Sequence, residues 1–274
     1  MTLSIITINY NNCDGLQKTI DSVLAQTWKD FEWIIIDGGS TDGSRELIEQ
    51  DQEHFAYWCS EPDKGVYNAM NKGIAKAKGE YINFMNSGDT FYEAETLGKV
   101  FAVERKADVM YGDWVEVHKD QDNPKGFSEK GLYATLWQQN ICHQATFIRA
   151  QLLSDENYDE DMHLLADWKW NTKKILGGVR FQHLDVCVCR YDTQGMSSKW
   201  DDIYWKERNE IIALYPDYMQ NAVANLDSLT QYKSIRMAHE LIRKGNGWAS
   251  LTQSLICAVF YLMRLFSHLK PGSR

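Results

Sequence analysis

The sequence predicts an α/β fold in which a mostly parallel sheet is flanked by helices, followed by a helical C-terminal extension. Apolar, β-branched runs alternate with helical patterns over residues 3–111, as in proteins built from βαβ units. The run at 3–9 is almost continuously apolar, as expected of a strand buried on both faces of a parallel sheet. From residue 201 onward the pattern is helical only. We therefore expect an α/β domain at 1–200 and a helical extension at 201–274.

The first half of the chain carries the clearest strand and helix patterns. Turn residues follow the first two strand patterns, and Ser40, Thr41 and Asp42 are suited to cap the second helix. We expect strands at 3–9, 32–37, 55–59, 80–85 and 108–111, and helices through 16–24, from near residue 41, at 66–78 and at 94–105. Beyond residue 112 the alternation weakens, and we expect strands near 114–117, 145–149 and 186–190 and a helix near 164–176.

Composition and charge argue against nucleic acid as a partner. The chain has 274 residues, a hydrophobic content of 44% and a net charge of −9, whereas binding to a phosphate backbone draws on clustered Lys and Arg. The charge is uneven, because residues 233–274 carry seven Lys or Arg and a single acid. This tail has a charge of +6, which leaves −15 for the rest of the chain. The basic tail therefore needs an explanation of its own.

The cysteines and the first residues suggest a reducing, cytoplasmic setting. None of the six cysteines forms a Cys-x-x-Cys pair, which favours reduced thiols over a zinc or redox site. The chain leads directly into the first strand pattern without a basic region or a cleavage site, so we expect no signal peptide.

Three acids, Asp37, Asp63 and Asp89, each follow a predicted strand, and ligands of open α/β sheets bind at that edge. An Asp in a turn often bonds only its own backbone, but three in succession favour a site. Neither Gly-x-Gly-x-x-Gly nor Gly-x-x-x-x-Gly-Lys-Ser/Thr occurs, which disfavours a dinucleotide-binding dehydrogenase and a Walker-type NTPase. If phosphates bind here, a divalent cation held by carboxylate is the candidate that neutralises them.

Several ordered motifs resemble the family 2 glycosyltransferases of GT-A fold. The resemblance covers roughly residues 2–198, and its middle part is similar to a bacterial subgroup that serves surface-polysaccharide and glycolipid assembly. The motifs are SIITINYNN (4–12), IIIDGGSTDGS (34–44), SEPDKGVYNAMNKGIAKAKGEYINFMNSGD (60–89), YDEDMHLLADWKWNTKKILGG (158–178) and RYDTQGMS (190–197). The resemblance implies a Rossmann-like GT-A domain that uses a nucleotide-sugar donor, usually a UDP-sugar, and a glycan or lipid-linked acceptor.

The resemblance also implies roles for single residues. It places Asp37 at the acid that bonds the base, Asp63 in the loop over the nucleotide, and Lys64 near the phosphates. The nucleotide-sugar site implied in this way comprises Thr7, Asn9, Tyr10, Asp37, Asp63, Lys64, Asn86 and Arg190. An ordinary surface Arg is nearly as good an explanation of Arg190, although an Arg there would pair well with phosphate oxygens.

The stretch Asn86-Ser87-Gly88-Asp89 occupies the place of the family's Asp-x-Asp-Asp metal motif. Asp89 matches the last acid, which contacts Mn²⁺ or Mg²⁺ together with the diphosphate. Asn86 and Gly88 stand where many relatives carry Asp. Asn86 can still bond a ribose hydroxyl, but Gly88 offers only backbone, which puts a strict dependence on metal in doubt.

Asp167 matches the family's catalytic base, which removes the proton of the acceptor hydroxyl as it attacks. Asp159, Glu160 and Asp161 lie close by in sequence and are alternatives, and Asp167 could also be a plain helix-surface acid. His143 and Gln144 match a His-Gln pair that related chains carry near the acceptor site, with a structural His about as good an explanation.

Residues 247–263 form an uncharged stretch of 17 residues. As a helix it would be about 25 Å long, short of the hydrocarbon core of about 30 Å. With the basic tail, residues 247–274 suit a helix on the anionic inner surface of the plasma membrane. The alternative is a helix packed on the catalytic domain.

Three functions remain open from the sequence. The leading one is an inverting glycosyltransferase. A nucleotidyltransferase would want a glycine-rich, basic loop after the first strand, which residues 11–14 are not. A catalytically silent glycan-binding or scaffold relative is suggested by Asn86 and Gly88, but the presence of Asp37, Asp89 and Asp167 together speaks against it.

Overall fold

The computed structural model describes residues 1–118, 121–129, 131–132, 136–193 and 202–230. The chain divides into two compact units, Met1–Tyr215 and Pro216–Arg274. In the second unit the structure describes residues 216–230, which form helix α9 (Asp217–Thr230) after Pro216. The first unit contains the sheet and every candidate site residue. The predicted membrane-surface helix at 247–274 and residues 194–197 of the RYDTQGMS motif lie outside the described residues.

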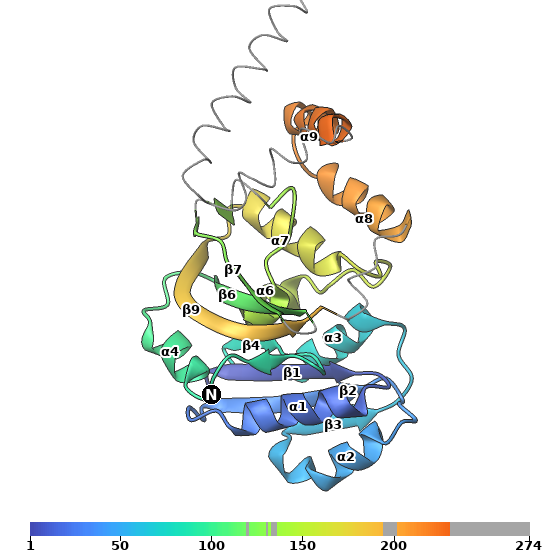
Figure 1. Ribbon diagram of the computed structural model, residues 1–274, viewed down its shortest axis with the longest axis vertical. Coiled ribbons are helices and arrows are strands. Elements are labelled where there is room, and N and C mark those ends of the chain that lie inside the picture. The colour runs from blue at the N-terminus through green and yellow to red at the C-terminus, as the bar shows by residue number, and fades with distance from the viewer. Residues whose placement is uncertain (119–120, 130, 133–135, 194–201, 231–274) are drawn as a thin grey trace, which may run out of the picture. The chain divides into compact units, whose positions relative to one another are not determined.

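A mixed, mostly parallel sheet organises the first unit (Figure 1). Its first half is parallel and has the order β3-β2-β1-β4, with bounds β1 (Leu3–Asn9), β2 (Phe31–Asp37), β3 (Tyr57–Ser60) and β4 (Tyr81–Phe84). The register pairs Asn9 with Asp37 and Asp37 with Ser60. Three strands therefore end side by side, as the alternating pattern predicts.

The second half of the sheet is less regular. β8 (Thr146–Arg149) runs antiparallel between β4 and β6 (Val109–His118), β9 (Phe181–Asp192) runs parallel to β6, and β5 (Thr90–Phe91) and β7 (Gln121–Lys125) pair antiparallel with β9 and β6. The sequence suggested two strands where β6 is one. The register of β6 against β9 shifts between Tyr111 and Trp114, where Gly112 approaches so closely that a Cβ would lie 2.4 Å from the Val186 carbonyl oxygen.

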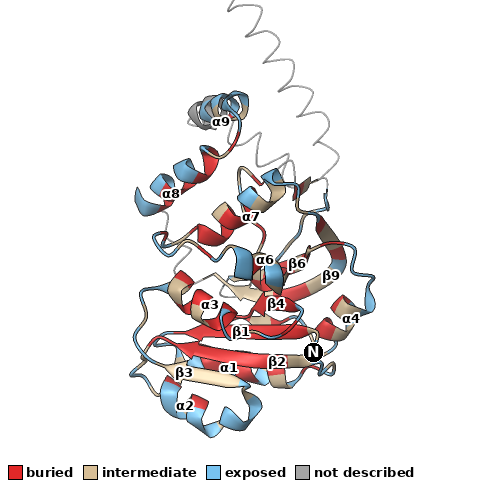
Figure 2. Ribbon diagram, turned by 180° about the vertical axis from the view of Figure 1, so that it is seen from behind, coloured by how far each residue is buried: buried red, intermediate tan, exposed pale blue. Residues whose placement is uncertain are grey.

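Helices cover both faces of the sheet. The bounds are α1 (Cys13–Leu24), α2 (Ser44–Gln50), α3 (Val66–Ile74), α4 (Thr96–Ala102), α6 (Ala150–Asp155), α7 (Ala166–Leu176) and α8 (Asp202–Ile212), with 3₁₀ turns η1 (Gln52–His54) and η2 (His143–Ala145). In Figure 1 α1 lies in front of the sheet, and in the opposite view of Figure 2 α3 does. All seven residues of β1 are consequently buried. Helix α3 ends four residues before the predicted end at 78, and α6 was not predicted.

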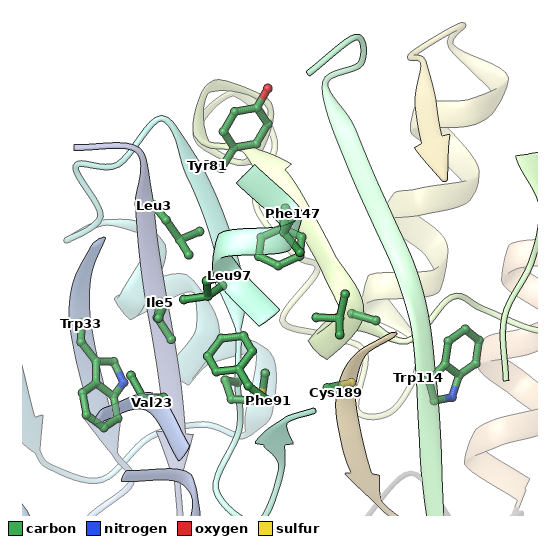
Figure 3. Packing of buried hydrophobic residues seen from close by; sticks show 14 of the residues in the cluster. Leu3, Ile5, Val23, Trp33, Tyr81, Phe91, Leu97, Trp114, Phe147 and Cys189 are labelled. Atoms are coloured by element: carbon green, nitrogen blue, oxygen red, sulfur yellow. The ribbon is translucent and has the colours of Figure 1, made fainter. Parts of the chain in front are cut away.

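The hydrophobic core continues through both halves of the sheet. Figure 3 shows it extending from Trp33 and Val23 past Phe91 and Phe147 toward Trp114. Such close-packed burial is the main source of stability of an α/β domain. This packing fixes the positions of the strand ends and of the loops that follow them, which carry polar side chains.

Candidate active site

The carboxyl ends of β1, β2 and β3 are tied together by Asp37. Asn9 Nδ2 donates to its Oδ1 at 2.8 Å, Ser60 Oγ donates to its Oδ2 at 2.6 Å, and the Ser40 hydroxyl and backbone N–H each donate to one oxygen. Burial acts to raise the pKa of Asp37, but the hydrogen bonds from Ser40, Ser60 and Asn9 outweigh it and hold the pKa below its usual value. Both oxygens of Asp37 accept hydrogen bonds and its side chain is not exposed, so Asp37 holds the ends of these strands together. Its contact with the nucleotide base stays a prediction.

A second carboxylate, that of Asp63, lies over the end of β2. A Cβ added to Gly38 would lie 2.6 Å from Asp63 Oδ2 and 3.1 Å from Tyr10 Cδ2, so only glycine leaves room for both side chains. Asp63 Oδ1 accepts the N–H of Gly65 at 2.9 Å, which fixes the loop before α3. The Tyr10 side chain is 66% exposed. Tyr10 and Asp63 thus form an open shelf, and the sequence reasoning missed that Gly38 makes it possible.

Thr7 is buried within β1 and does not face solvent. Its hydroxyl donates to the Met85 carbonyl at 2.8 Å and accepts the Trp33 indole N–H at 3.0 Å. Its predicted contact with nucleotide would therefore be indirect, through the position of Met85 at the end of β4.

Asp89 is buried at the turn after β4, and its side chain bridges two later segments of the chain. Its Oδ1 accepts the Asp192 backbone N–H at 2.9 Å, and its Oδ2 accepts from Gln144 Nε2. Burial raises the pKa of Asp89 to about 6, although these two hydrogen bonds act to lower it. The neighbouring Gly88 has a φ of +101°, a conformation that glycine adopts without strain.

The residues around Asp89 fit a divalent cation only in part. Within the described ranges no group of three or more His, Cys, Asp or Glu side chains is placed to hold a metal ion. Asn86 Oδ1 is buried and has no hydrogen-bond partner among the residues that the structure describes, so the motif offers one carboxamide oxygen besides the Asp89 carboxylate. That set suits Mg²⁺ or Mn²⁺ only if substrate phosphates and water supply the remaining ligands.

Asp167 lies in the first turn of α7 and is 8% exposed. Its Oδ1 accepts the Tyr67 hydroxyl at 2.9 Å, and its Oδ2 accepts Asn140 Nδ2 at 2.7 Å. The Nδ1 atom of His143 lies 3.4 Å from the same Oδ2. A carboxylate has about four acceptor positions, so these contacts leave room for a substrate hydroxyl.

Four residues that hold Asp167 in place, directly or through a partner, were not anticipated from the sequence. Asn171 Nδ2 donates to Asn140 Oδ1 at 2.9 Å, which orients the Asn140 amide toward Asp167. Glu207 on α8 accepts the backbone N–H groups of 163–165 at 2.6–3.0 Å and so fixes the segment before α7. Tyr67 lies inside a recognised motif, but no local pattern in the sequence indicates which partner its hydroxyl contacts.

The competing acids are already engaged elsewhere. Asp159 forms an ion pair with Lys169 at 2.8 Å, and Glu160 accepts from Asn68 and Asn71. These hydrogen bonds lower the pKa of Asp159 and of Glu160, which makes both weaker bases. Asp161 is exposed. Of the four acids in this segment, Asp167 alone combines burial with this set of donors.

His143 and Gln144 connect the two buried carboxylates. These neighbours in η2 contact Asp167 and Asp89 respectively. His143 Nε2 also lies 2.9 Å from Asn86 Nδ2. The structure thus brings Asn86, Asp89, His143, Gln144 and Asp167 into one connected cluster.

The side chains of the two predicted cations make their contacts with other residues. Arg190 pairs with Asp122 on β7 and lies 5.0 Å over the Tyr92 ring. Lys64 is exposed, and with Tyr67 and His163 it lines a cavity of about 190 Å³ at the start of α3. Their predicted contacts with phosphate stay predictions.

Comparison with known proteins places this site in context. The family model described as Glycosyl transferase family 2 matches residues 4–156. An uncharacterized glycosyltransferase of Mycobacterium tuberculosis is 36% identical over 206 residues, which cover 72% of this chain and 77% of the relative. A PGL/p-HBAD biosynthesis glycosyltransferase of Mycobacterium bovis is 34% identical over 210 residues, which cover 70% of this chain and 77% of the relative.

Solved structures share the fold at low sequence identity. S. aureus TarS superposes with a TM-score of 0.64 at 18% identity; the match covers 78% of this chain and 39% of the TarS chain. A shorter TarS chain, residues 1–349 in complex with UDP-GlcNAc, has a TM-score of 0.64 at 19% identity over 78% of this chain and 65% of that chain. Mannosyltransferase PcManGT from Pyrobaculum calidifontis, in complex with GDP-Man and Mn²⁺, has a TM-score of 0.57 at 14% identity, covering 94% of this chain and 86% of that chain.

Proposed function

The chain belongs to glycosyl transferase family 2 and is a glycosyltransferase, and on that premise we propose that it transfers a sugar from a UDP-sugar, with inversion, to a glycan or lipid-linked acceptor of surface-polysaccharide or glycolipid biosynthesis. One observation carries the proposal. Asp167 is a buried carboxylate held by Tyr67 and Asn140. It is connected through His143 and Gln144 to Asp89.

In this proposal Asp167 is the general base. A sugar hydroxyl is a poor nucleophile at neutral pH, and a positioned carboxylate that accepts its proton during attack contributes typically about 10²–10⁴-fold. The proton moves to a free acceptor position of Asp167, the acceptor oxygen forms the new bond to the anomeric carbon, and the nucleoside diphosphate leaves from the opposite face.

Tyr67 can form a hydrogen bond with Asp167 both when Asp167 is charged and when it is protonated. The Tyr67 hydroxyl lies 2.8 Å from the Leu164 carbonyl oxygen and 2.9 Å from Asp167 Oδ1, but it has one proton to donate. It can donate to Asp167 while the carboxylate is charged. Once Asp167 has taken a proton, the carboxyl can donate to the Tyr67 oxygen while Tyr67 donates to Leu164. The Leu164 carbonyl oxygen therefore accepts the Tyr67 proton only in the second of these two states.

The donor would bind along the carboxyl edge. We assign the nucleotide base of the donor to the shelf formed by Tyr10 and Asp63. We assign its diphosphate to the neighbourhood of Asn86 and Asp89. Mn²⁺ or Mg²⁺ bound at Asp89 would supply Lewis-acid stabilisation of the departing diphosphate. The relatives' names support a glycolipid context, because one of them is a PGL/p-HBAD biosynthesis glycosyltransferase.

We further propose that the C-terminal part brings the enzyme to the inner face of the plasma membrane. The basic charge of 233–274 supports this, since a cationic segment is attracted to anionic lipid. Among the described residues no helix is long and apolar enough to cross a membrane. The predicted domain boundary at residue 200 stays a prediction, and Glu207 shows that α8 contributes to the site.

The test is release of nucleoside diphosphate from a panel of UDP-, GDP- and TDP-sugars with Mn²⁺ or Mg²⁺, comparing the wild type with Asp89→Ala. We expect turnover of a UDP-sugar that the substitution abolishes. Turnover that is equal in both proteins would refute the role of Asp89. Binding of UDP without turnover of any donor would favour the silent relative or an absolute need for the acceptor, which added lipid-linked acceptors would separate.

A further inference from the structure

An unbroken line of polar contacts joins the metal-motif residue Asn86 to the proposed base. Asn86 Nδ2 lies 2.9 Å from His143 Nε2, and His143 Nδ1 lies 3.4 Å from Asp167 Oδ2. His143 is partly buried, and its imidazole spans the gap between the turn after β4 and the first turn of α7. The proposed function gives Asn86 and Asp167 roles with the substrates, but it gives His143, which lies between them, no role of its own.

The two contacts are compatible with one tautomer of neutral His143. An ionised carboxylate only accepts hydrogen bonds, so Asp167 requires the proton on Nδ1. Neutral histidine then has a bare Nε2, which needs a donor, and Asn86 supplies its Nδ2. The opposite orientation of the Asn86 amide would place the proton on Nε2. A bare Nδ1 would then face the carboxylate, lone pair against lone pair.

Asn86 has a second free group. Its Oδ1 is buried and has no hydrogen-bond partner in the described part of the chain. The amide therefore presents its nitrogen to His143 and leaves its oxygen for a donor-site ligand such as a ribose hydroxyl. An aspartate at this position would act differently, because it has no N–H to offer and would draw the proton onto Nε2.

We propose that His143 is a positioning residue for Asp167: Asn86 holds it in the Nδ1–H tautomer, and its Nδ1–H orients the carboxylate. The inference rests on the proposed function, in which Asp167 is the base. Asn86 is then the residue that sets the tautomer of His143. His143 Nδ1 and Asp167 Oδ2 are 3.4 Å apart without substrate, and hydrogen bonds between catalytic groups often tighten only in the substrate complex.

Two substitutions of His143 separate its two contacts. In His143→Asn the side-chain N–H₂ takes the place of Nδ1–H and keeps a donor toward Asp167. In His143→Gln the amide reaches toward Asn86, and the donor toward Asp167 is lost. We expect His143→Gln to lower kcat about tenfold, the effect of one lost hydrogen bond to a charged group, with KM for the donor unchanged. His143→Asn should keep most of the wild-type kcat.

The tautomer itself can be observed without substrate. In the full-length chain carrying ¹⁵N-labelled histidine, the His143 signals are identified by their loss in His143→Gln. We expect a protonated Nδ1 and an unprotonated Nε2 in the wild type, and a protonated Nε2 in Asn86→Asp. A protonated Nε2 in the wild type, or equal kcat for His143→Asn and His143→Gln, would overturn the proposal. If the wild type turns over no donor even with lipid-linked acceptors added, the proposed function fails while the nitrogen signals still decide the tautomer.

Discussion

The Tyr67 hydroxyl lies 2.9 Å from Asp167 Oδ1 although 100 positions separate the two residues in the chain. Tyr67 belongs to the first turn of α3, and Asp167 belongs to the first turn of α7. The contact joins a helix that covers β1 and β2 to a helix from the second half of the unit. A nucleotide-side motif and the proposed base are therefore parts of one hydrogen-bonded assembly.

Tyr67→Phe should lower kcat for hydrolysis of the nucleotide-sugar about tenfold and leave KM nearly unchanged. The substitution removes a hydrogen bond to the charged Asp167 but no contact with the nucleotide-sugar. Steady-state kinetics with the best donor of the panel is the measurement. Tyr158→Phe is the matched control, since its ring lies 5.6 Å from that of Tyr67 and is equally buried. Equal losses in both variants would show a general packing effect.

Asp89→Asn should stabilise the metal-free protein at neutral pH. Burial raises the pKa of Asp89 from 3.8 to about 6. Below the lower value the carboxyl is protonated in folded and unfolded chains alike. As the pH rises through this interval the unfolded chain ionises first, so the free energy of unfolding falls, by about 3 kcal/mol in all. Urea unfolding with chelator at pH 7.5 should show that gain for Asp89→Asn, and at about pH 3, below the lower pKa, the two proteins should be equal.

Asp37→Asn should have the opposite effect. The hydrogen bonds of Asp37 outweigh its burial and lower its pKa, so its carboxylate stabilises the fold above the usual pKa of Asp, and that contribution is lost as the pH falls. The substitution places an N–H₂ against donors from Ser40, Ser60 and Asn9. We expect a loss of about 1–3 kcal/mol at pH 7, measured by the same urea unfolding. A stabilised Asp37→Asn would contradict the assignment of its hydrogen bonds.

Gly38→Ala should weaken UDP binding with little change in thermal stability. The added Cβ would meet Asp63 Oδ2 at 2.6 Å, and the carboxylate can turn away more easily than backbone can move. We expect Kd for UDP, measured by calorimetry, to rise about tenfold through the loss of one charged contact. Gly98→Ala in α4 is the control, because its Cβ would meet nothing closer than Trp28 at 3.9 Å and should stabilise the helix slightly. An unchanged Kd in Gly38→Ala would remove Asp63 from the nucleotide site.

Glu207→Gln should lower both stability and kcat. Glu207 accepts three consecutive backbone N–H groups before α7, and the amide of Gln would turn a donor toward them. A loss of about 1–3 kcal/mol is expected in urea unfolding. Glu210→Gln on the same helix is the control, since Glu210 is exposed and its ion pair with Lys169 spans 3.5 Å. Comparable losses in the two variants would mean that Glu207 has no special role.

The parallel half of the fold could be predicted because its signals are local. The apolar runs that form β1 and β2, and the acids Asp37 and Asp89 at strand ends, are visible in short stretches of sequence. Strands β5 and β7 could not be found in this way. The first has two residues, and the second, QDNPK, has no apolar alternation and is held by pairing with β6.

The same distinction between local and long-range signals applies to the candidate site. Asp167 was identified by its motif, but its partners Tyr67, Asn140 and Glu207 come from other parts of the chain. Each partner is an ordinary polar residue in its own local sequence. Only the tertiary structure brings it to the carboxylate or to the segment that carries it, and the same holds for the space that Gly38 leaves for Asp63.

The role of Asp167 as general base is tested most directly by the turnover of Asp167→Asn at saturating donor, measured together with its affinity for UDP. The substitution keeps the size of the side chain and removes its ability to take a proton. We expect kcat to fall at least about 100-fold while Kd for UDP stays within about twofold of the wild type. A variant that retains turnover close to the wild type would contradict it.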